Sequence, residues 1–412
     1  MGSRSTHSAS SRTHSILWLS LVIFVGLNLR PFLTGIGPLV HDIVDATGLS
    51  FKNIAWLTLL PMACMGVFAF VTPSVRRHLS SRHTMLFALG LLLSGSALRL
   101  FVPNGFSLIL TAALCGIGVA LLQALLPAII KQHFPFHVAP VTGLYSAMLM
   151  MGGAMGAQIT PWVAAATESW RFSLAFWALP VLAAVFIGWY VLPKDAPNRS
   201  AKFPSDILMR RPRTWLLIVC FGLINSSYTS IVAWLAPFYQ EQGWSASASG
   251  SLIAVLSIAQ AIAALSIPTL ARKHVDRRPW LWFSLSLQAL GFASYAFWPS
   301  AAPYFWSSVI GVGLGGCFAL TLVVALDHFD DPVQAGVLSA LMQGGGFLIA
   351  AIAPWTSALI RDVSGGFTNA WILHLGLVGV IAVLVWRFSP KHYQKVMAPL
   401  ELKTAATTHK QA

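Results

Sequence analysis

Charged residues are scarce in this chain. Asp, Glu, Lys and Arg make up 9% of its 412 residues, whereas 56% of the residues are hydrophobic. A soluble domain carries roughly 25% charged residues, so this chain cannot cover a water-facing surface. Acidic residues are the scarcest, with 12 Asp and Glu against 26 Lys and Arg. This composition excludes an ordinary soluble protein and indicates a protein that lies in lipid.

Motifs for catalysis, phosphate binding and metal binding are also missing. The sequence contains no Walker A motif, no HExxH and no Ser, His and Asp in the order of a hydrolase triad. The cysteines Cys64, Cys115, Cys220 and Cys317 lack CxxC spacing and lie in apolar runs, which indicates packing residues rather than disulfides or metal ligands. We therefore expect no enzyme activity, no catalytic residue, no metal and no cofactor.

Long apolar runs are what the chain does contain. A run of about 20 residues crosses roughly 30 Å of hydrocarbon. Twelve such runs occupy residues 16–40, 53–74, 84–101, 106–130, 139–164, 171–192, 214–238, 249–271, 279–298, 303–326, 335–360 and 367–387. The sequence predicts an all-α membrane protein with twelve transmembrane helices and the lipid bilayer as its surroundings.

Basic residues lie mostly in one set of the loops between these runs. This set holds 21 of the 26 Lys and Arg, whereas the opposite loops hold only Lys52, Arg99, Arg171 and Arg361. Because basic loops stay in the cytoplasm, we expect both termini and the central loop to be cytoplasmic, in a multi-pass protein of a bacterial inner membrane. A nucleic-acid partner is not expected, since the charges are scattered over many segments.

The chain contains an internal repeat. Seven residues of the fifth run recur 193 positions later in the eleventh: Gly143, Ser146, Ala147, Gly152, Gly153, Pro161 and Trp162 against Gly336, Ser339, Ala340, Gly345, Gly346, Pro354 and Trp355. Other runs match at 195 positions, including His133 with His328. Six runs return the chain to the same side, so the halves have parallel topology. Two six-helix bundles around a central cavity are the architecture of major facilitator transporters.

The repeat also predicts the domain boundaries. We expect six-helix bundles at 16–192 and 214–390, with a polar cytoplasmic linker at 193–213. Residues 1–15 are predicted to form a disordered cytoplasmic tail, and residues 391–412 a second cytoplasmic tail. Glycines of the fifth and eleventh runs allow close helix packing. The sequence leaves open whether they serve packing alone or also an interface at which the halves rock.

One charged residue, Arg30, lies deep in an apolar run. It is about fourteen residues into the first run, roughly 21 Å from its cytoplasmic end, where a charge costs about 2.5–3.5 kcal/mol on insertion scales. All twelve acidic residues lie in loops or at run ends, so we expect no buried carboxylate beside it. A guanidinium without a protein counter-ion predicts binding of a small planar or linear anion. The alternative is that Arg30 extends to the outer membrane surface.

Further polar residues inside the runs are candidates for the same substrate site. Runs four, seven and eleven commonly line the cavity in this architecture. This favours Gln123, Asn225 and Gln343, one in each of these runs, as substrate-binding residues. A single Gln in a run more often joins helices, so packing is the alternative for each. Pro31 is expected to loosen the helix beside Arg30. The predicted substrate-binding residues are Arg30, Asn28, Gln123, Tyr145, Asn225, Tyr228 and Gln343.

Several stretches resemble one transporter family. GLNLRPFLTGIGPL at 26–39 is similar to the first-helix motif of the cyanate and 2-nitroimidazole transporter family, within the major facilitator superfamily. Further similar stretches are LLQALLPAIIKQHF (121–134), AWLAPFY (233–239), ALDH (325–328) and MQGGGFLIAAIAPW (342–355). The resemblance covers about residues 16–390 and is strongest to the cyanate branch. It implies a monomer and a small anionic or nitro-bearing substrate.

Together these features predict a secondary transporter of a small anion, cyanate or a similar one, that works by alternating access. The alternative is an efflux or uptake transporter of nitroimidazole-like or other small organic compounds. Since the sequence places no acid deep in a run, it predicts facilitated diffusion or a symport in which the proton travels with the substrate. Asp327, at the cytoplasmic end of the tenth run, is the residue that could contradict this.

Overall fold

The computed structural model describes residues 4–78, 80–134, 138–192, 205–271, 273–329, 332–393 and 397. Within these residues every regular element is a helix, as predicted. The first half of the chain contains α1 (Arg4–Asn28), α2 (Pro31–Thr34), η1 (Gly37–Leu39), α3 (Val40–Thr47), α4 (Phe51–Ile54), α5 (Trp56–His78), α6 (Ser81–Leu98), η2 (Arg99–Phe101), α7 (Gly105–His133), α8 (Val138–Thr167), α9 (Trp170–Ala175) and α10 (Ala178–Val191).

The short helix α11 (Ser205–Met209) precedes the second half. This half contains α12 (Pro212–Gln240), α13 (Ala246–Ala271), α14 (Arg278–Phe297), α15 (Pro303–Leu326), α16 (Pro332–Ser364), α17 (Thr368–Val385) and η3 (Pro390–His392). Ten helical stretches in the described part of the chain have the length and hydropathy to cross a membrane. Helices α8 and α14, of 30 and 20 residues, complete the predicted twelve.

The first helix begins before the first apolar run. The backbone of α1 is helical from Arg4, within the residues 1–15 that the sequence predicts to be a disordered tail. Helix α11 lies within the predicted linker 193–213. Residues 193–204 and most of 391–412 lie outside the described residues.

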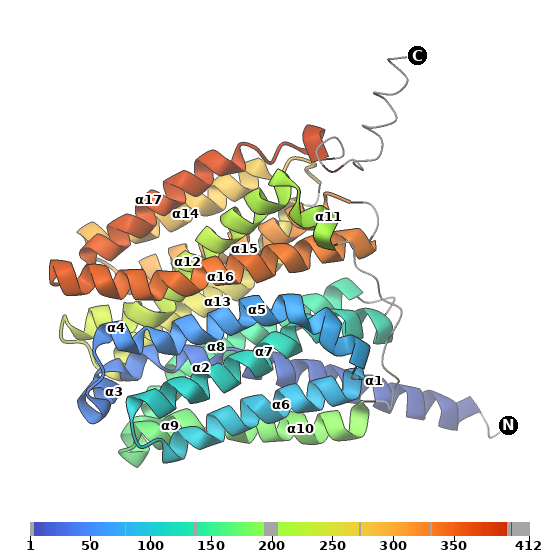
Figure 1. Ribbon diagram of the computed structural model, residues 1–412, viewed down its shortest axis with the longest axis horizontal. Coiled ribbons are helices and arrows are strands. Elements are labelled where there is room, and N and C mark those ends of the chain that lie inside the picture. Colours follow the sequence, from blue (N-terminus) through green and yellow to red (C-terminus); the bar gives the residue numbers. More distant parts are fainter. Residues whose placement is uncertain are drawn as a thin grey trace.

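The two halves lie beside one another as two helical layers (Figure 1). Helix α8 of the first half packs against α13 of the second, and α5 packs against α16. Helix α1 begins and α17 ends at the same end of the molecule, which we name the terminal end, whereas α3 and α4 lie at the opposite, far end (Figure 1). The substrate path of such a fold runs between these layers.

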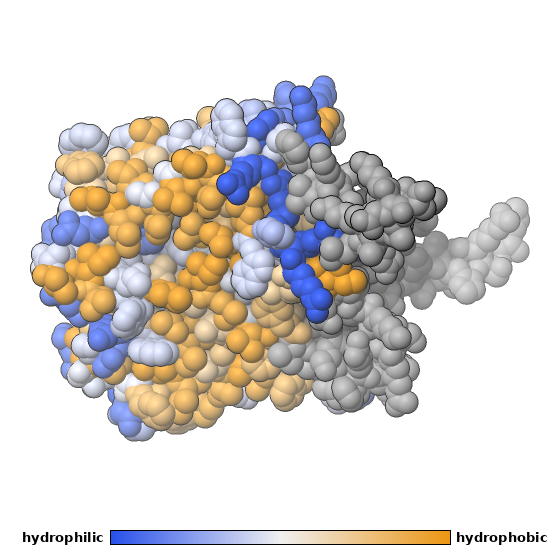
Figure 2. Space-filling view, turned by 45° about the horizontal axis from the view of Figure 1, so that its top comes forward, coloured by the Kyte–Doolittle hydropathy of each residue, from blue (hydrophilic) through white to orange (hydrophobic). Residues whose placement is uncertain are grey.

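The outer surface matches the hydrocarbon of a bilayer. Figure 2 shows hydrophobic side chains over the middle of the molecule and hydrophilic ones toward its two ends. Large apolar side chains are exposed in this belt, among them Phe87, Phe186, Ile262 and Val383. In water such an extended apolar surface would drive aggregation, and in lipid it is the surface that the surroundings favour.

Candidate functional site

The first span is broken at Arg30. Helix α1 ends at Asn28 and α2 begins at Pro31, because proline has no N–H to continue the helical hydrogen bonds. The carbonyl of Arg30 accepts hydrogen bonds from the N–H groups of Leu33 and Thr34, at 2.9 and 3.1 Å. Arg30 therefore caps a new helical turn with its backbone, and its side chain leaves the helix axis at the break.

The guanidinium of Arg30 is buried and only partly satisfied. The residue is 5% exposed, so the alternative in which it extends to the membrane surface is wrong. Its Cζ lies 5.1 Å from the ring centroid of Tyr228, a favourable cation–π distance. Nε and Nη1 have no hydrogen-bond partner. The ion pairs of the described residues involve Arg277, Arg278 and Arg361 instead.

Arg30 and the second half approach one another at Gly153 of α8. A Cβ atom built on Gly153 of α8 would lie 3.6 Å from Arg30 Cβ, 3.6 Å from Thr34 Cγ2 and 3.6 Å from Ser257 Oγ of α13. These are ordinary van der Waals distances. Ser257 is 1% exposed, and its hydroxyl has no hydrogen-bond partner. Ser257 was not among the residues predicted from the sequence, since serines are common in the apolar runs.

The neighbouring glycines of α8 have a different role. A Cβ on Gly152 would lie 2.1 Å from the carbonyl oxygen of Leu27, and one on Gly156 would lie 2.3 Å from Thr34 Oγ1. Side chains at these positions would collide with the first span. Gly152 and Gly156 therefore serve helix packing, whereas a methyl group would fit at Gly153, where the two halves meet.

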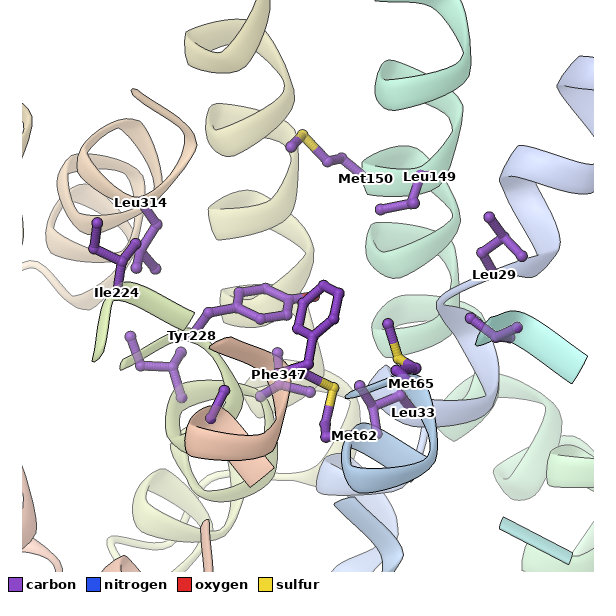
Figure 3. Close-up of a cluster of buried hydrophobic side chains, with 14 of the residues drawn as sticks. Leu29, Leu33, Met62, Met65, Leu149, Met150, Ile224, Tyr228, Leu314 and Phe347 are labelled. Atoms are coloured by element: carbon purple, nitrogen blue, oxygen red, sulfur yellow. The ribbon is translucent and has the colours of Figure 1, made fainter. Parts of the chain in front are cut away.

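Apolar side chains from both halves enclose this region. Figure 3 shows Tyr228 of α12 beside Phe347 of α16, facing Met62 and Met65 of α5 and Leu33 of α2. All five are buried. Such surroundings have a low dielectric constant, which strengthens the attraction between a guanidinium and an anion and raises the cost of leaving either one unpaired.

The other predicted site residues lie in varied positions. Tyr145 of α8 is buried and within electrostatic range of Arg30. Three amides donate within their own helices: Asn28 Nδ2 to Phe24 O at 2.7 Å, Asn225 Nδ2 to Phe221 O at 2.9 Å, and Gln343 Nε2 to Ser339 Oγ at 3.3 Å. Gln123 is half-buried on α7. The structure thus brings Tyr145 and Tyr228 to Arg30.

Arg99 is a second buried arginine, which corrects its predicted place in a loop. It is 0% exposed, and its Nη1 donates to the carbonyl of Phe32 at 3.0 Å. Nε and Nη2 have no hydrogen-bond partner. The end of α6 points inward here, so Arg99 reaches α2 instead of water. It fixes the turn that follows Arg30.

The halves are joined at the far end. Gln240 Nε2 donates to the carbonyl of Pro38 at 2.9 Å, and Gln240 Oε1 pairs with His41 Nδ1 at 2.7 Å. The Cζ of Arg361 lies 3.9 Å from the ring centroid of Phe51. Each contact joins a residue of the first half to one of the second, so the protein is closed at this end.

Fold and site define a class of protein. Twelve membrane helices in two repeated halves, with a buried cation at their interface, describe a solute transporter. The sequence profile of the Major Facilitator Superfamily matches residues 19–354. The chain belongs to this superfamily, and it is a multi-pass membrane transporter rather than an enzyme.

Individual proteins resemble the chain along nearly its whole length. The cyanate transport protein CynX of Escherichia coli (strain K12) is 40% identical over 92% of this chain and 98% of its own. The 2-nitroimidazole transporter of the same organism is 28% identical over 91% of this chain and 95% of its own. A crystal structure of a D-xylose–proton symporter has a TM-score of 0.77 at 13% identity, covering 92% of this chain and 98% of its own. The last likeness concerns the fold alone.

Proposed function

We propose that this protein is a secondary transporter of cyanate or a similarly small anion, and that Arg30 holds the anion. The observation that carries the proposal is the guanidinium of Arg30, which is buried with two unpartnered nitrogens. A guanidinium keeps its charge at physiological pH and presents a planar fork of donors. A small anion would supply both the missing charge and the missing acceptors. The 40% identity to a cyanate transport protein supports this choice of anion.

The transport cycle that we propose is alternating access between bundles 16–192 and 214–390. The far end is closed here, so the anion would exchange at the terminal end. We place this end in the cytoplasm, at the inner face of a bacterial inner membrane, because 21 of the 26 basic residues lie on that side. The proposed unit is a monomer.

The residues that we propose for substrate binding differ in how close they lie to Arg30. Tyr145 and Tyr228 would contact the anion or position Arg30, since both are buried near it. Asn28, Gln123, Asn225 and Gln343 are retained as substrate-binding proposals along the path. Each of the three amides that donate within their own helices keeps a second N–H that would be available to the anion.

Transport of a nitroimidazole-like compound is the second candidate. The apolar and aromatic wall formed by Tyr228, Phe347, Met62 and Met65 favours it, because a flat ring gains from aromatic contacts. A nitro group would still interact with Arg30. The relative that is a 2-nitroimidazole transporter supports this alternative.

Uptake into proteoliposomes tests the two candidates. Wild type should take up labelled cyanate, Arg30→Ala should not, and Arg30→Lys should be slower by roughly tenfold or more, since an ammonium lacks the planar fork. Arg210→Ala, which removes an exposed arginine, is the matched control and should behave like wild type. Unchanged cyanate uptake by a folded Arg30→Ala protein would refute the anion site. Uptake of labelled 2-nitroimidazole without uptake of cyanate would favour the alternative.

A further inference from the structure

Ser257 differs from the other hydroxyl residues of its helix. Buried serines and threonines in helices usually donate to a carbonyl of the preceding turn. The others described on α13 with such a bond are Ser249, Ser251, Ser266 and Thr269, at 3.1, 2.6, 2.8 and 2.8 Å. Ser257 makes no such bond and is 1% exposed. Its hydroxyl is therefore available to a partner that the protein itself does not supply.

Gly153 lies between Ser257 and Arg30. A Cβ atom built on Gly153 would contact both Ser257 Oγ and Arg30 Cβ at 3.6 Å, without a clash. The internal repeat shows that this is particular to the first half. Gly346 is the repeat counterpart of Gly153, and a Cβ there would lie 2.5 Å from Phe221 Cδ1. Gly346 is packed tightly within the second half, whereas a Cβ atom on Gly153 would make ordinary contacts with residues of both halves.

We propose that Ser257 is a second substrate ligand and that a triatomic anion bridges Arg30 of the first half and Ser257 of the second. This inference rests on the proposed function. One end of the anion accepts from the guanidinium of Arg30, and the other accepts the O–H of Ser257. Gly153 sets the size limit, because any side chain there would fill the space between them. Binding would then draw the two halves together around the substrate.

The test compares anions that can contact Arg30 and Ser257 at the same time with an anion that cannot. Cyanate and azide are triatomic with an acceptor at each end, whereas bromide is a single atom that can reach only Arg30. Affinities are measured on the purified full-length protein in detergent by the dependence of its melting temperature on each sodium salt. Ser257→Ala should weaken cyanate and azide by about 10-fold to 100-fold, as expected for a hydrogen bond to a charged group. The affinity of the Ser257→Ala protein for bromide should change by less than about twofold.

Three further variants separate a ligand from a structural role. Ser257→Thr keeps the hydroxyl and should retain more than half of the cyanate affinity of wild type. Gly153→Ala should weaken the triatomic anions at least about 10-fold without lowering the melting temperature of the unliganded protein. Ser266→Ala and Gly90→Ala are the matched controls, since Ser266 is exposed on the same helix and Gly90 has open space around its Cβ position.

Two results would overturn the bridge. One is a Ser257→Ala protein that keeps the full wild-type affinity for cyanate and azide. The other is a loss of bromide affinity in Ser257→Ala as large as the loss of cyanate affinity. Failure of the proposed function looks different. If wild type binds azide but neither binds nor transports cyanate, and azide binding needs both Arg30 and Ser257, the bridge stands and cyanate is the wrong substrate. If a folded wild-type protein binds none of the three anions, the bridge and the anion site both fall.

Discussion

Among the residues of the first half whose burial the structure describes, two arginines are buried, and they differ in what their guanidinium groups contact. Arg30 stacks over Tyr228 and has two unpartnered nitrogens. Arg99 donates to the carbonyl of Phe32, two residues after Arg30. A buried charge costs folding free energy even when it is hydrogen-bonded to the backbone. The burial of Arg99 therefore indicates a role other than stability. We interpret Arg99 as a positioning residue, which holds the broken first span so that Arg30 faces the second half.

The role of Arg99 can be tested by Arg99→Met, which keeps the volume and removes the charge. We expect anion uptake to fall roughly tenfold or more, since a charge-assisted hydrogen bond of about 1.5–3 kcal/mol is lost from α2. The melting temperature should stay the same or rise, because a desolvated charge has gone. Uptake kinetics and a melting curve measure both. Uptake equal to wild type would show that α2 needs no such anchor.

At the scale of elements, helix α8 both packs against the first span and faces the second half. Its Gly152 and Gly156 allow contact with the first span, and Gly153 faces the second half at α13. The same helix therefore holds Arg30 in place and borders the space that the substrate would use. Gly344 of α16 likewise faces the opposite half, since a Cβ atom there would lie 2.9 Å from Phe70 Cε2 of α5.

Packing predicts a sharp contrast between glycines. Gly152→Ala brings a methyl group to 2.1 Å from a backbone carbonyl, which cannot move as a flexible side chain can. We expect a loss of about 1–3 kcal/mol of stability, seen as a lower melting temperature in detergent. Gly376→Ala on α17, where a Cβ meets nothing within 4 Å, is the control and should not lower it. Equal melting temperatures would contradict the close contact of α8 with α1.

Helices α12 and α15 meet at the terminal end through a histidine. Arg213 Nε donates to His328 Nε2 at 2.9 Å, and His328 Nδ1 lies 2.6 Å from the carbonyl of Val324. The ring therefore carries its proton on Nδ1 and is neutral. Burial and, to a smaller extent, the positive charge of Arg213 lower the pKa of His328 from 6.5 to about 4. The arginine of α12 thus excludes a second positive charge beside it.

This arrangement predicts acid sensitivity. Because the pKa of His328 is lower in the folded than in the unfolded protein, the unfolded chain takes up the proton first. Stability is therefore complete above pH 6.5 and decreases as the pH falls toward 4. In His328→Gln this loss disappears, so its melting temperature should fall less than that of wild type between pH 7 and pH 5. Parallel curves for the two proteins would show that His328 does not titrate in this way.

At the scale of the whole molecule, the structure has one closed end and one end that carries both chain termini. The far end is joined by Gln240, His41 and Arg361. Access to Arg30 from the terminal end is what this arrangement favours. Orientation in the membrane then decides whether the state seen here binds substrate from inside or outside the cell.

Cysteine labelling tests the orientation. We expect Lys273→Cys, in the exposed loop at the terminal end, to resist a membrane-impermeant thiol reagent in intact cells. Ser300→Cys, in the exposed loop at the far end, should react. Both positions are exposed in the structure, so disrupted cells should allow both to react. The reverse pattern would invert the topology and place the closed end in the cytoplasm.

Coupling to protons involves the whole transport cycle. Asp327, the acid that could carry a proton, forms an ion pair with Arg277 at 3.1 Å in the terminal end of the second half. We therefore expect an imposed pH gradient to have the same effect on cyanate uptake by proteoliposomes with wild type and with Asp327→Asn. Gradient-driven accumulation that is lost only in a folded Asp327→Asn protein would assign the proton to this carboxylate.

Much of this protein follows from its sequence because each membrane span must satisfy its own backbone hydrogen bonds. Length, hydropathy and the repeat are therefore local properties, and they predict the twelve helices, the duplication and the buried Arg30 without reference to tertiary contacts. The burial of Arg99 could not be predicted in this way, because it depends on the contact between the end of α6 and α2. The partnerless hydroxyl of Ser257 and its nearness to Arg30 at Gly153 depend on the packing of α8 against α13. Side chains about a hundred residues apart meet there, and only the tertiary structure decides which of them do.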